Sequence, residues 1–238
     1  MPFKTNNYSF LIAVLTCLLI AKNSYAQSDD TNDLESWNSV NLKYKLNKKW
    51  TFDAEVQLRL KDEISEISEY LGELNAQYSV SKAFKLGAGF RYTRENDNVG
   101  KVQGYENHFR FHVDATYKHK INDFSIKYRL RYQNKNELGL STSEGDFANQ
   151  HIRFKTSFDY NFKNWKLDPI FSAEIFNHFE EGEENGFDKY RLTLGTEYKF
   201  KNVGTLGLFY RIEKELNETI PETTNIIGLK YSYTFKNK

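Results

Sequence analysis

The sequence predicts an all-β fold: an antiparallel up-and-down transmembrane β-barrel of ten to twelve strands, with short periplasmic turns and longer extracellular loops. Three observations lead to this prediction. Apolar and polar residues alternate with period two over long segments, and short polar turns recur between these segments. The segments are also about as long as the roughly 9 to 11 residues that a tilted membrane strand needs.

The first 26 residues are typical of a secretory signal peptide. Lys4 is followed by an apolar run from Phe10 to Ala21, and a small-residue site ends at Ala26. The run is too short for a permanent membrane helix, which needs about 20 apolar residues. We therefore expect export and cleavage after Ala26. Cys17 lies within the run, so the mature chain contains no cysteine for disulfide or thiol chemistry.

The mature chain is close to neutral. The whole sequence has 33 basic and 32 acidic residues, and loss of Lys4 and Lys22 leaves 31 basic residues. A nucleic-acid-binding protein would normally carry a basic excess, so we expect no nucleic-acid partner. The pattern is uniform after a short polar segment at residues 27–36, and this predicts one barrel domain over residues 37–238.

The hairpin from Tyr105 to Gln133 shows the alternation most clearly. One side of its first arm is apolar and carries Tyr105, Phe109, Phe111, Val113, Ala115 and Tyr117. The other side is mostly ionic and carries Glu106, His108, Arg110, His112, Asp114 and Lys118. After a turn at residues 121–123 the second arm repeats the rule. Period two over such a length indicates β-strands, because helical residues would repeat with period 3.6.

Tight turns and longer polar stretches alternate along the chain. The tight turns fall at residues 46–50, 80–84, 121–124, 162–165 and 200–203. The longer stretches are Asp62 to Glu69, Thr93 to Gly104, Asn134 to Phe147, Glu180 to Gly186 and Glu215 to Glu222. This order predicts short turns at one end of a barrel and long loops at the other. It gives eleven arms between Leu34 and Phe235, whereas bacterial barrels normally have an even number. Either the N-terminal arm lies outside the wall or the segmentation is off by one.

The size of the barrel indicates which face meets water. About eight strands already enclose a ligand-sized interior in soluble barrels, and a wider one needs a filler such as a central helix. The sequence offers no helical segment for this role. The alternative places apolar residues against lipid, with aromatic residues such as Trp50 and Trp165 near the strand ends. We therefore expect a bacterial outer-membrane location. The expected partners are membrane lipid, lipopolysaccharide and, during insertion, the barrel-assembly machinery.

Three short segments carry a family resemblance: Tyr128 to Tyr132, Pro169 to Phe176 and Tyr190 to Gly195. With the punctuation of tight turns and aromatic residues, they resemble a domain-of-unknown-function family of outer-membrane β-barrels of Bacteroidota. The resemblance covers roughly Trp37 to Phe235 and implies fold and location, without an assigned activity. The chain departs from the usual aromatic end of such barrels, because three further residues follow Phe235.

Inward-facing charges are the candidate functional residues. Arginines recur at similar distances from the tight turns, and acids share their faces, so the sequence predicts a charge band lining the lumen. Its members are Arg59, Arg91, Arg110, Arg131, Arg153, Arg191, Arg211, Glu55, Glu106, Asp114, Glu174, Glu197 and Glu213. The band can act as an ion-pair network that stiffens the wall, or as the selectivity filter of a narrow channel. Because the charges nearly balance, we expect weak selectivity at most.

Other candidate chemistry is weaker. His108 and His112 are four residues apart on one strand, roughly 13 Å, so they cannot share one metal ion. The acidic stretches at residues 62–69 and 180–184 lack the ligand spacing of a calcium loop, although divalent ions could bridge them to lipopolysaccharide. Pro169 should cause a bulge or break in its strand, and Gly87, Gly89, Gly195, Gly207 and Gly228 should face inward. No cofactor or metal site is predicted.

Two other classes remain open. An outer-membrane lipid hydrolase would need a serine activated by a histidine on the lipid face, and no serine lies two residues from a histidine. Cross-strand pairing could still form such a site. A soluble exported ligand-binding barrel would place the apolar faces inside. The sequence contains no catalytic motif, and the expected function is a narrow channel or a structural protein of the envelope.

Overall fold

The computed structural model describes residues 31–98, 103–141, 148–162, 166–182 and 185–237. The expected signal peptide, with Cys17, and Trp165 lie outside the described residues. The described chain forms eleven strands and no helix. They are β1 (Thr31–Lys45), β2 (Trp50–Lys61), β3 (Glu66–Ser79), β4 (Phe84–Asp97), β5 (Gly104–Ile121), β6 (Phe124–Glu137), β7 (Asn149–Tyr160), β8 (Asp168–Phe179), β9 (Gly186–Phe200), β10 (Gly204–Glu215) and β11 (Glu222–Lys236). Accordingly, no helix in these residues could cross a membrane.

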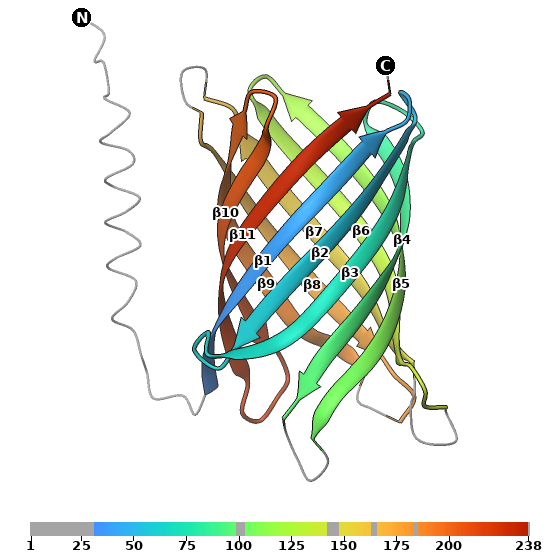
Figure 1. The fold of residues 1–238 in the computed structure, drawn as a ribbon, viewed down its shortest axis with the longest axis vertical. Helices are drawn as coiled ribbons and strands as arrows, with labels where there is room; N and C mark the ends of the chain where they lie inside the picture. Colours follow the sequence, from blue (N-terminus) through green and yellow to red (C-terminus); the bar gives the residue numbers. More distant parts are fainter. Residues whose placement is uncertain (1–30, 99–102, 142–147, 163–165, 183–184, 238) are drawn as a thin grey trace, which may run out of the picture. The chain divides into compact units, whose positions relative to one another are not determined.

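The strands close into a barrel in sequence order, and β1 and β11 form the seam. All neighbours along the chain pair antiparallel, but the seam is parallel, from Thr31 beside Glu222 to Lys45 beside Lys236. Figure 1 shows the β1 and β11 arrows side by side and pointing the same way. The expectation of a wholly antiparallel wall is therefore wrong at this seam. The count of eleven is correct: the first arm joins the wall, starting at Thr31 rather than at Trp37.

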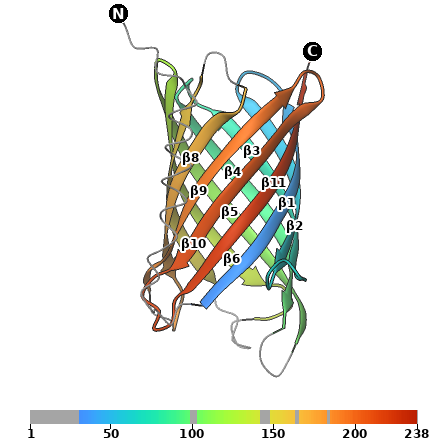
Figure 2. The same cartoon turned by 90° about the vertical axis from the view of Figure 1, so that its left-hand side faces the viewer.

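Short turns gather at one end of the barrel and longer connections at the other (Figure 1, Figure 2). Side chains shape the short turns. The Asn47 carboxamide oxygen accepts hydrogen bonds from the backbone N–H groups of Lys49 and Trp50, both at 2.8 Å. The Ser81 hydroxyl does the same for the N–H groups of Ala83 and Phe84. Such side-chain bonds replace the ladder where the chain reverses. We call these the turn end and the loop end of the barrel.

The loop between β2 and β3 is shorter than the sequence suggests. We expected a polar loop from Asp62 to Glu69, but β3 begins at Glu66. Asp62 and Glu63 turn with positive φ angles of 53° and 57°, and their N–H groups donate to the Asp33 carboxylate. Glu69 already lies in the wall and points into the lumen, where it forms an ion pair with Arg59.

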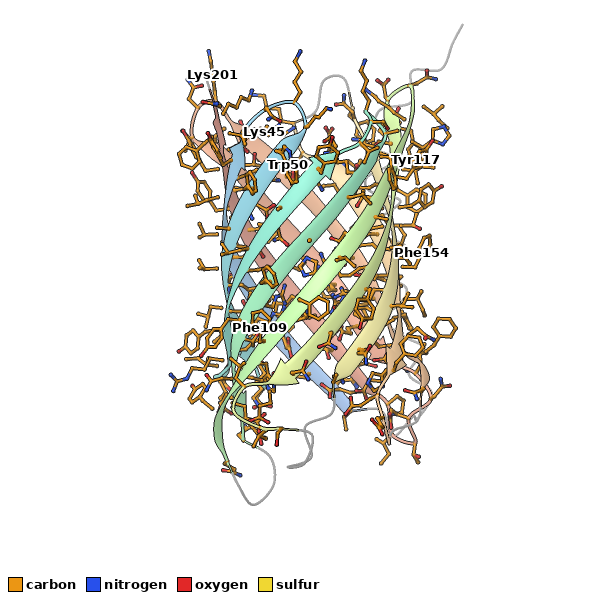
Figure 3. The ribbon with its side chains drawn as sticks, turned by 90° about the vertical axis from the view of Figure 1, so that its right-hand side faces the viewer. Lys45, Trp50, Phe109, Tyr117, Phe154 and Lys201 are labelled. Carbon is orange, nitrogen blue, oxygen red and sulfur yellow. The ribbon has the colours of Figure 1, made fainter. Side chains whose placement is uncertain are left out.

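The two faces of the wall differ sharply in polarity. Large apolar side chains are exposed on the outside, among them Val56, Leu74, Phe90, Leu130 and Leu208. Figure 3 shows Trp50, Tyr117, Phe109 and Phe154 projecting outward from the wall. Aromatic rings pair on this outer face near the turn end, as in Trp50 with Tyr78, whose ring centroids are 4.9 Å apart. The buried side chains are mainly polar or charged and line the inside. The expected alternation and its register are thus present.

Two local expectations have different outcomes. Pro169 does not break β8: it is the second residue of the strand, lies beyond Ile170, the last residue that pairs with β7, and still pairs with Thr196 of β9. The irregularity in the β8–β9 pairing lies instead between Phe176 and Asn177. Gly89 does face inward. A Cβ there would lie 2.1 Å from Asn75 Oδ1 and 2.6 Å from His112 Cε1, so this glycine makes room for two lumen side chains.

Candidate functional site

The seven predicted arginines all line one cavity in the lumen, with a volume of about 800 Å³. Glu55, Glu174 and Glu213 line it as well. The cavity extends to the loop end, because its wall includes Ser68, Asn136 and Glu180 next to the longer connections. Arg129, which faces inward on β6, lines it too. We call these eight arginines the arginine band: Arg59, Arg91, Arg110, Arg129, Arg131, Arg153, Arg191 and Arg211.

Glu174 is the centre of one half of the band. Its side chain is only 2% exposed, and it accepts from Arg129 at 2.5 Å and from Arg153 at 2.8 Å. Arg191 approaches the second oxygen at 3.9 Å and also pairs with Glu213. Three guanidinium groups from β6, β7 and β9 therefore converge on one carboxylate of β8. Because a buried carboxylate of this kind is costly without its cations, this cluster acts as one unit.

Glu73 has the same role on the opposite wall. Its Oε2 lies 2.6 Å from Arg91 Nε and 3.1 Å from Arg110 Nη2. Next to this group, Arg131 binds the Asp114 carboxylate with two parallel hydrogen bonds of 2.7 and 2.8 Å. This paired geometry is the strongest form of the arginine–carboxylate interaction. Glu73 is not a member of the predicted charge band, although it pairs with two arginines of the arginine band.

Three members of the predicted charge band lie outside the cavity wall. Within the described residues, Asp114 contacts the band through its hydrogen bonds with Arg131. Glu106 lies near the start of β5 at the loop end, and its carboxylate is 3.3 Å from His108 Nε2. Glu197 lies toward the turn end opposite Asp168 and makes no ion pair within the described part of the chain. The structure therefore brings ten of the thirteen predicted residues together around the cavity.

Apolar residues inside the lumen are the part that the sequence analysis missed. Trp37, Phe176 and Ile226 are buried, with 7%, 4% and 0% of their surfaces exposed, and they line the cavity together with Phe209. The Trp37 ring faces three guanidinium groups: Arg59 at 3.5 Å, Arg211 at 4.8 Å and Arg191 at 5.3 Å. The alternation along β1 is the signal that could have placed Trp37 inside. Trp37 is two residues from Glu35, so both side chains lie on the same face of the strand, and both line the cavity.

Contacts between strands that are not neighbours reach across the lumen. Arg191 on β9 contacts Trp37 on β1, although β10 and β11 separate these strands. Arg129 on β6 binds Glu174 on β8, and Lys230 on β11 binds Glu55 on β2 at 2.5 Å. Side chains from strands that are not neighbours thus meet inside the lumen at the level of the band.

Two of the histidines form hydrogen-bonded pairs with carboxylates. His151 Nε2 lies 2.9 Å from Asp188, and His178 Nε2 lies 3.1 Å from Glu180. The two imidazole rings are 4.8 Å apart. Among the described residues no group of three or more histidine, cysteine, aspartate or glutamate side chains has the geometry to hold a metal ion. Acidic residues 183–184 lie outside the described residues.

The described histidines make no hydrogen bond to a serine hydroxyl. The lipid-hydrolase alternative stays a prediction. What the observed site can do chemically is electrostatic: guanidinium groups in a confined, polar lumen attract anions and hold them by paired hydrogen bonds.

The fold and the site together define a closed β-barrel of eleven strands with an apolar outer face and an arginine-rich lumen. The chain belongs to the family described as "Protein of unknown function (DUF2490)", whose family model matches residues 34–222. No curated protein matched the chain. The family match covers all strands up to the start of β11, and therefore the whole arginine band.

Proposed function

We propose that this protein is an integral barrel of a Gram-negative outer membrane, of the type found in Bacteroidota, and that its lumen is a narrow channel with weak selectivity. The observation that carries the proposal is the inverted polarity of the wall. A soluble barrel of eleven strands would bury its apolar faces. Here residues such as Val56, Leu74 and Leu208 are 62%, 64% and 54% exposed on the outside, while charged residues line the inside.

The strand lengths support a membrane setting. The strands range from 12 residues in β2 to 18 in β5, enough for a tilted membrane strand with its ends in the interface. Aromatic residues lie on the outer face near both ends, among them Trp50 at the turn end and Tyr105 at the loop end. In this arrangement the short turns face the periplasm and the loops face outward. In this proposal the predicted signal peptide directs export of the chain, and the barrel-assembly machinery then inserts the barrel into the outer membrane.

The channel part of the proposal follows from the cavity. The cavity is polar and reaches the loop end, and side chains of the arginine band project into it from seven strands. Twelve basic and ten acidic residues line the cavity, so the expected selectivity is weak and favours anions. A band that only stiffened the wall would give a barrel without conductance.

Conductance in planar bilayers tests the channel, and the matched pair R110Q and R94Q tests the role of the band. Arg110 lies in the band, and its removal leaves Glu73 paired with Arg91 at 2.6 Å. Arg94 is exposed on the outer face, 4.8 Å from the Tyr105 ring. We expect small, steady currents in the native protein, a larger current with less anion preference in R110Q, and native behaviour in R94Q.

Complete absence of current from correctly folded protein would overturn the channel. The membrane part is tested separately by cell fractionation and by heat-modifiable migration in gels. A fully soluble protein in the periplasmic fraction would refute it.

A further inference from the structure

Within the arginine band, cations outnumber the carboxylates that contact them. Five carboxylates lie within 4.0 Å of seven of the eight arginines: those of Glu69, Glu73, Asp114, Glu174 and Glu213. Glu35 and Glu55 also line the cavity, but the first accepts a hydrogen bond from Trp37 at 2.5 Å and the second binds Lys230. The band therefore keeps a local positive excess, although the whole lumen is nearly balanced.

Arg211 is the arginine of the band that has no carboxylate within 4.0 Å among the described residues. Its side chain makes one hydrogen bond there, from Nε to Thr193 Oγ1 at 3.0 Å. Its guanidinium group lies against two rings, 4.6 Å from Phe209 and 4.8 Å from Trp37. Neither terminal nitrogen is buried without a partner, and the residue lines the cavity. Two donor groups of a fixed cation are thus available to a solute.

Two further arginines have buried donors that are not used. Arg110 Nε and Arg129 Nε have no hydrogen-bond partner in the described part of the chain, although both are shielded from solvent. A buried donor without a partner costs roughly 1 to 3 kcal/mol. The shortage of acceptors therefore extends over the band and is not limited to one side chain.

The aromatic residues fix the geometry of the cations around Trp37. Arg59 stacks at 3.5 Å and is also held by Glu69, and Arg191 is held by Glu174 and Glu213. Three guanidinium groups within 5.3 Å of one ring repel one another, and the ring offsets only part of this repulsion. An oxyanion next to Arg211 would complete the charge balance with paired hydrogen bonds.

We propose that Arg211, with Arg59 and Arg191 around Trp37, forms a binding subsite for the carboxylate or phosphate group of a small solute that enters the cavity from the loop end. We call it the Trp37 subsite. The proposal deepens the channel function, and it rests on that function only for the route of entry. Binding itself requires the closed barrel and its cavity.

Tryptophan fluorescence can report on this subsite directly. The chain has three tryptophans, and replacing Trp50 and Trp165 by phenylalanine leaves Trp37 as the reporter. The full barrel, folded in detergent micelles, is titrated with sodium phosphate in one series and sodium acetate in another, and chloride keeps the ionic strength constant. We expect a saturable change in Trp37 emission in at least one series, and the series with the lower midpoint identifies the preferred group.

The variant R211Q should raise the midpoint at least tenfold, and R94Q on the outer face should leave it unchanged. The variant R211K keeps the charge without the planar donor fork and should raise the midpoint several-fold. If R211Q does not fold, R211K decides the matter. A response that does not saturate, or equal midpoints in the native protein and the Arg211 variants, would overturn the subsite. Saturable binding without bilayer current would keep the subsite and reject the channel, whereas current without binding would do the reverse.

Discussion

Glu174→Gln is the substitution that tests the lumen network most directly. The side chain of Glu174 is only 2% exposed. Its carboxylate oxygens lie 2.5 Å from Arg129, 2.8 Å from Arg153 and 3.9 Å from Arg191. Glutamine keeps the size and one acceptor oxygen but removes the negative charge that the three cations share. Breaking a buried ion pair by removing one partner costs about 3 to 5 kcal/mol. Because Arg191 retains Glu213, we expect a loss near the lower end, about 3 kcal/mol in the free energy of unfolding.

The assay is reversible urea unfolding in lipid vesicles, followed by fluorescence and by heat-modifiable migration. Glu197→Gln is the matched control. Glu197 also faces the lumen but has no ion-pair partner within 4.0 Å in the described part of the chain. The free energy of unfolding of the Glu197→Gln variant should therefore differ from that of the native protein by less than about 0.5 kcal/mol. Equal stability of the two variants would refute the view that Glu174 holds this half of the band together.

Two other predictions concern the wall. Leu130→Arg places a cation on the outer face midway along β6, where Leu130 is 50% exposed, and should lower the free energy of unfolding in vesicles by about 2 to 4 kcal/mol. Tyr117→Arg, near the turn end of β5, should lower it by about 0 to 1 kcal/mol. Equal costs for these variants would contradict a bilayer centred on the strands. Gly89→Ala should destabilise the barrel by about 1 kcal/mol, because its Cβ would overlap the side-chain ends of Asn75 and of the buried His112, which would have to shift. Gly72→Ala, whose Cβ would meet nothing within 4 Å, is the neutral control, and an equal loss in both would argue against crowding as the cause.

Much of this architecture could be predicted because alternation is a local signal. In each strand of the Tyr105 to Gln133 hairpin, the alternation of polar and apolar residues shows which face is polar. This alternation places Arg110 and Arg131 on the inner face. The similar spacing of the arginines from their turns was enough to place all seven in one cavity.

The missed features depend on relations between distant strands. The parallel seam joins the first strand to the last, and no local pattern distinguishes a strand that closes the wall from one that lies outside it. The partners within the band were equally hidden. Glu174 binds Arg129 across an intervening strand, so the choice of partner depends on the tilt and closure of the barrel and not on sequence distance. Composition alone also does not assign an aromatic residue to the lumen, because aromatic residues in barrels usually mark the outer interface, whereas Trp37 and Phe209 line the cavity.

The candidate site depends on the parallel pairing of β1 with β11, which closes the barrel with an odd number of strands. The parallel seam sets Trp37 beside Gly228, and Gly228 in turn pairs with Phe209, which pairs with Gly195. Two large rings and two glycines therefore alternate along one row across four strands. A Cβ on Gly228 would lie 1.9 Å from the Phe209 ring, so that ring lies directly over the glycine. Without β1, the wall would lack Trp37, and Arg59, Arg191 and Arg211 would lose the ring they share. Closure of the barrel by β1 thus supplies the aromatic ring against which these three cations lie. The parallel seam is therefore part of the structure that forms the candidate site.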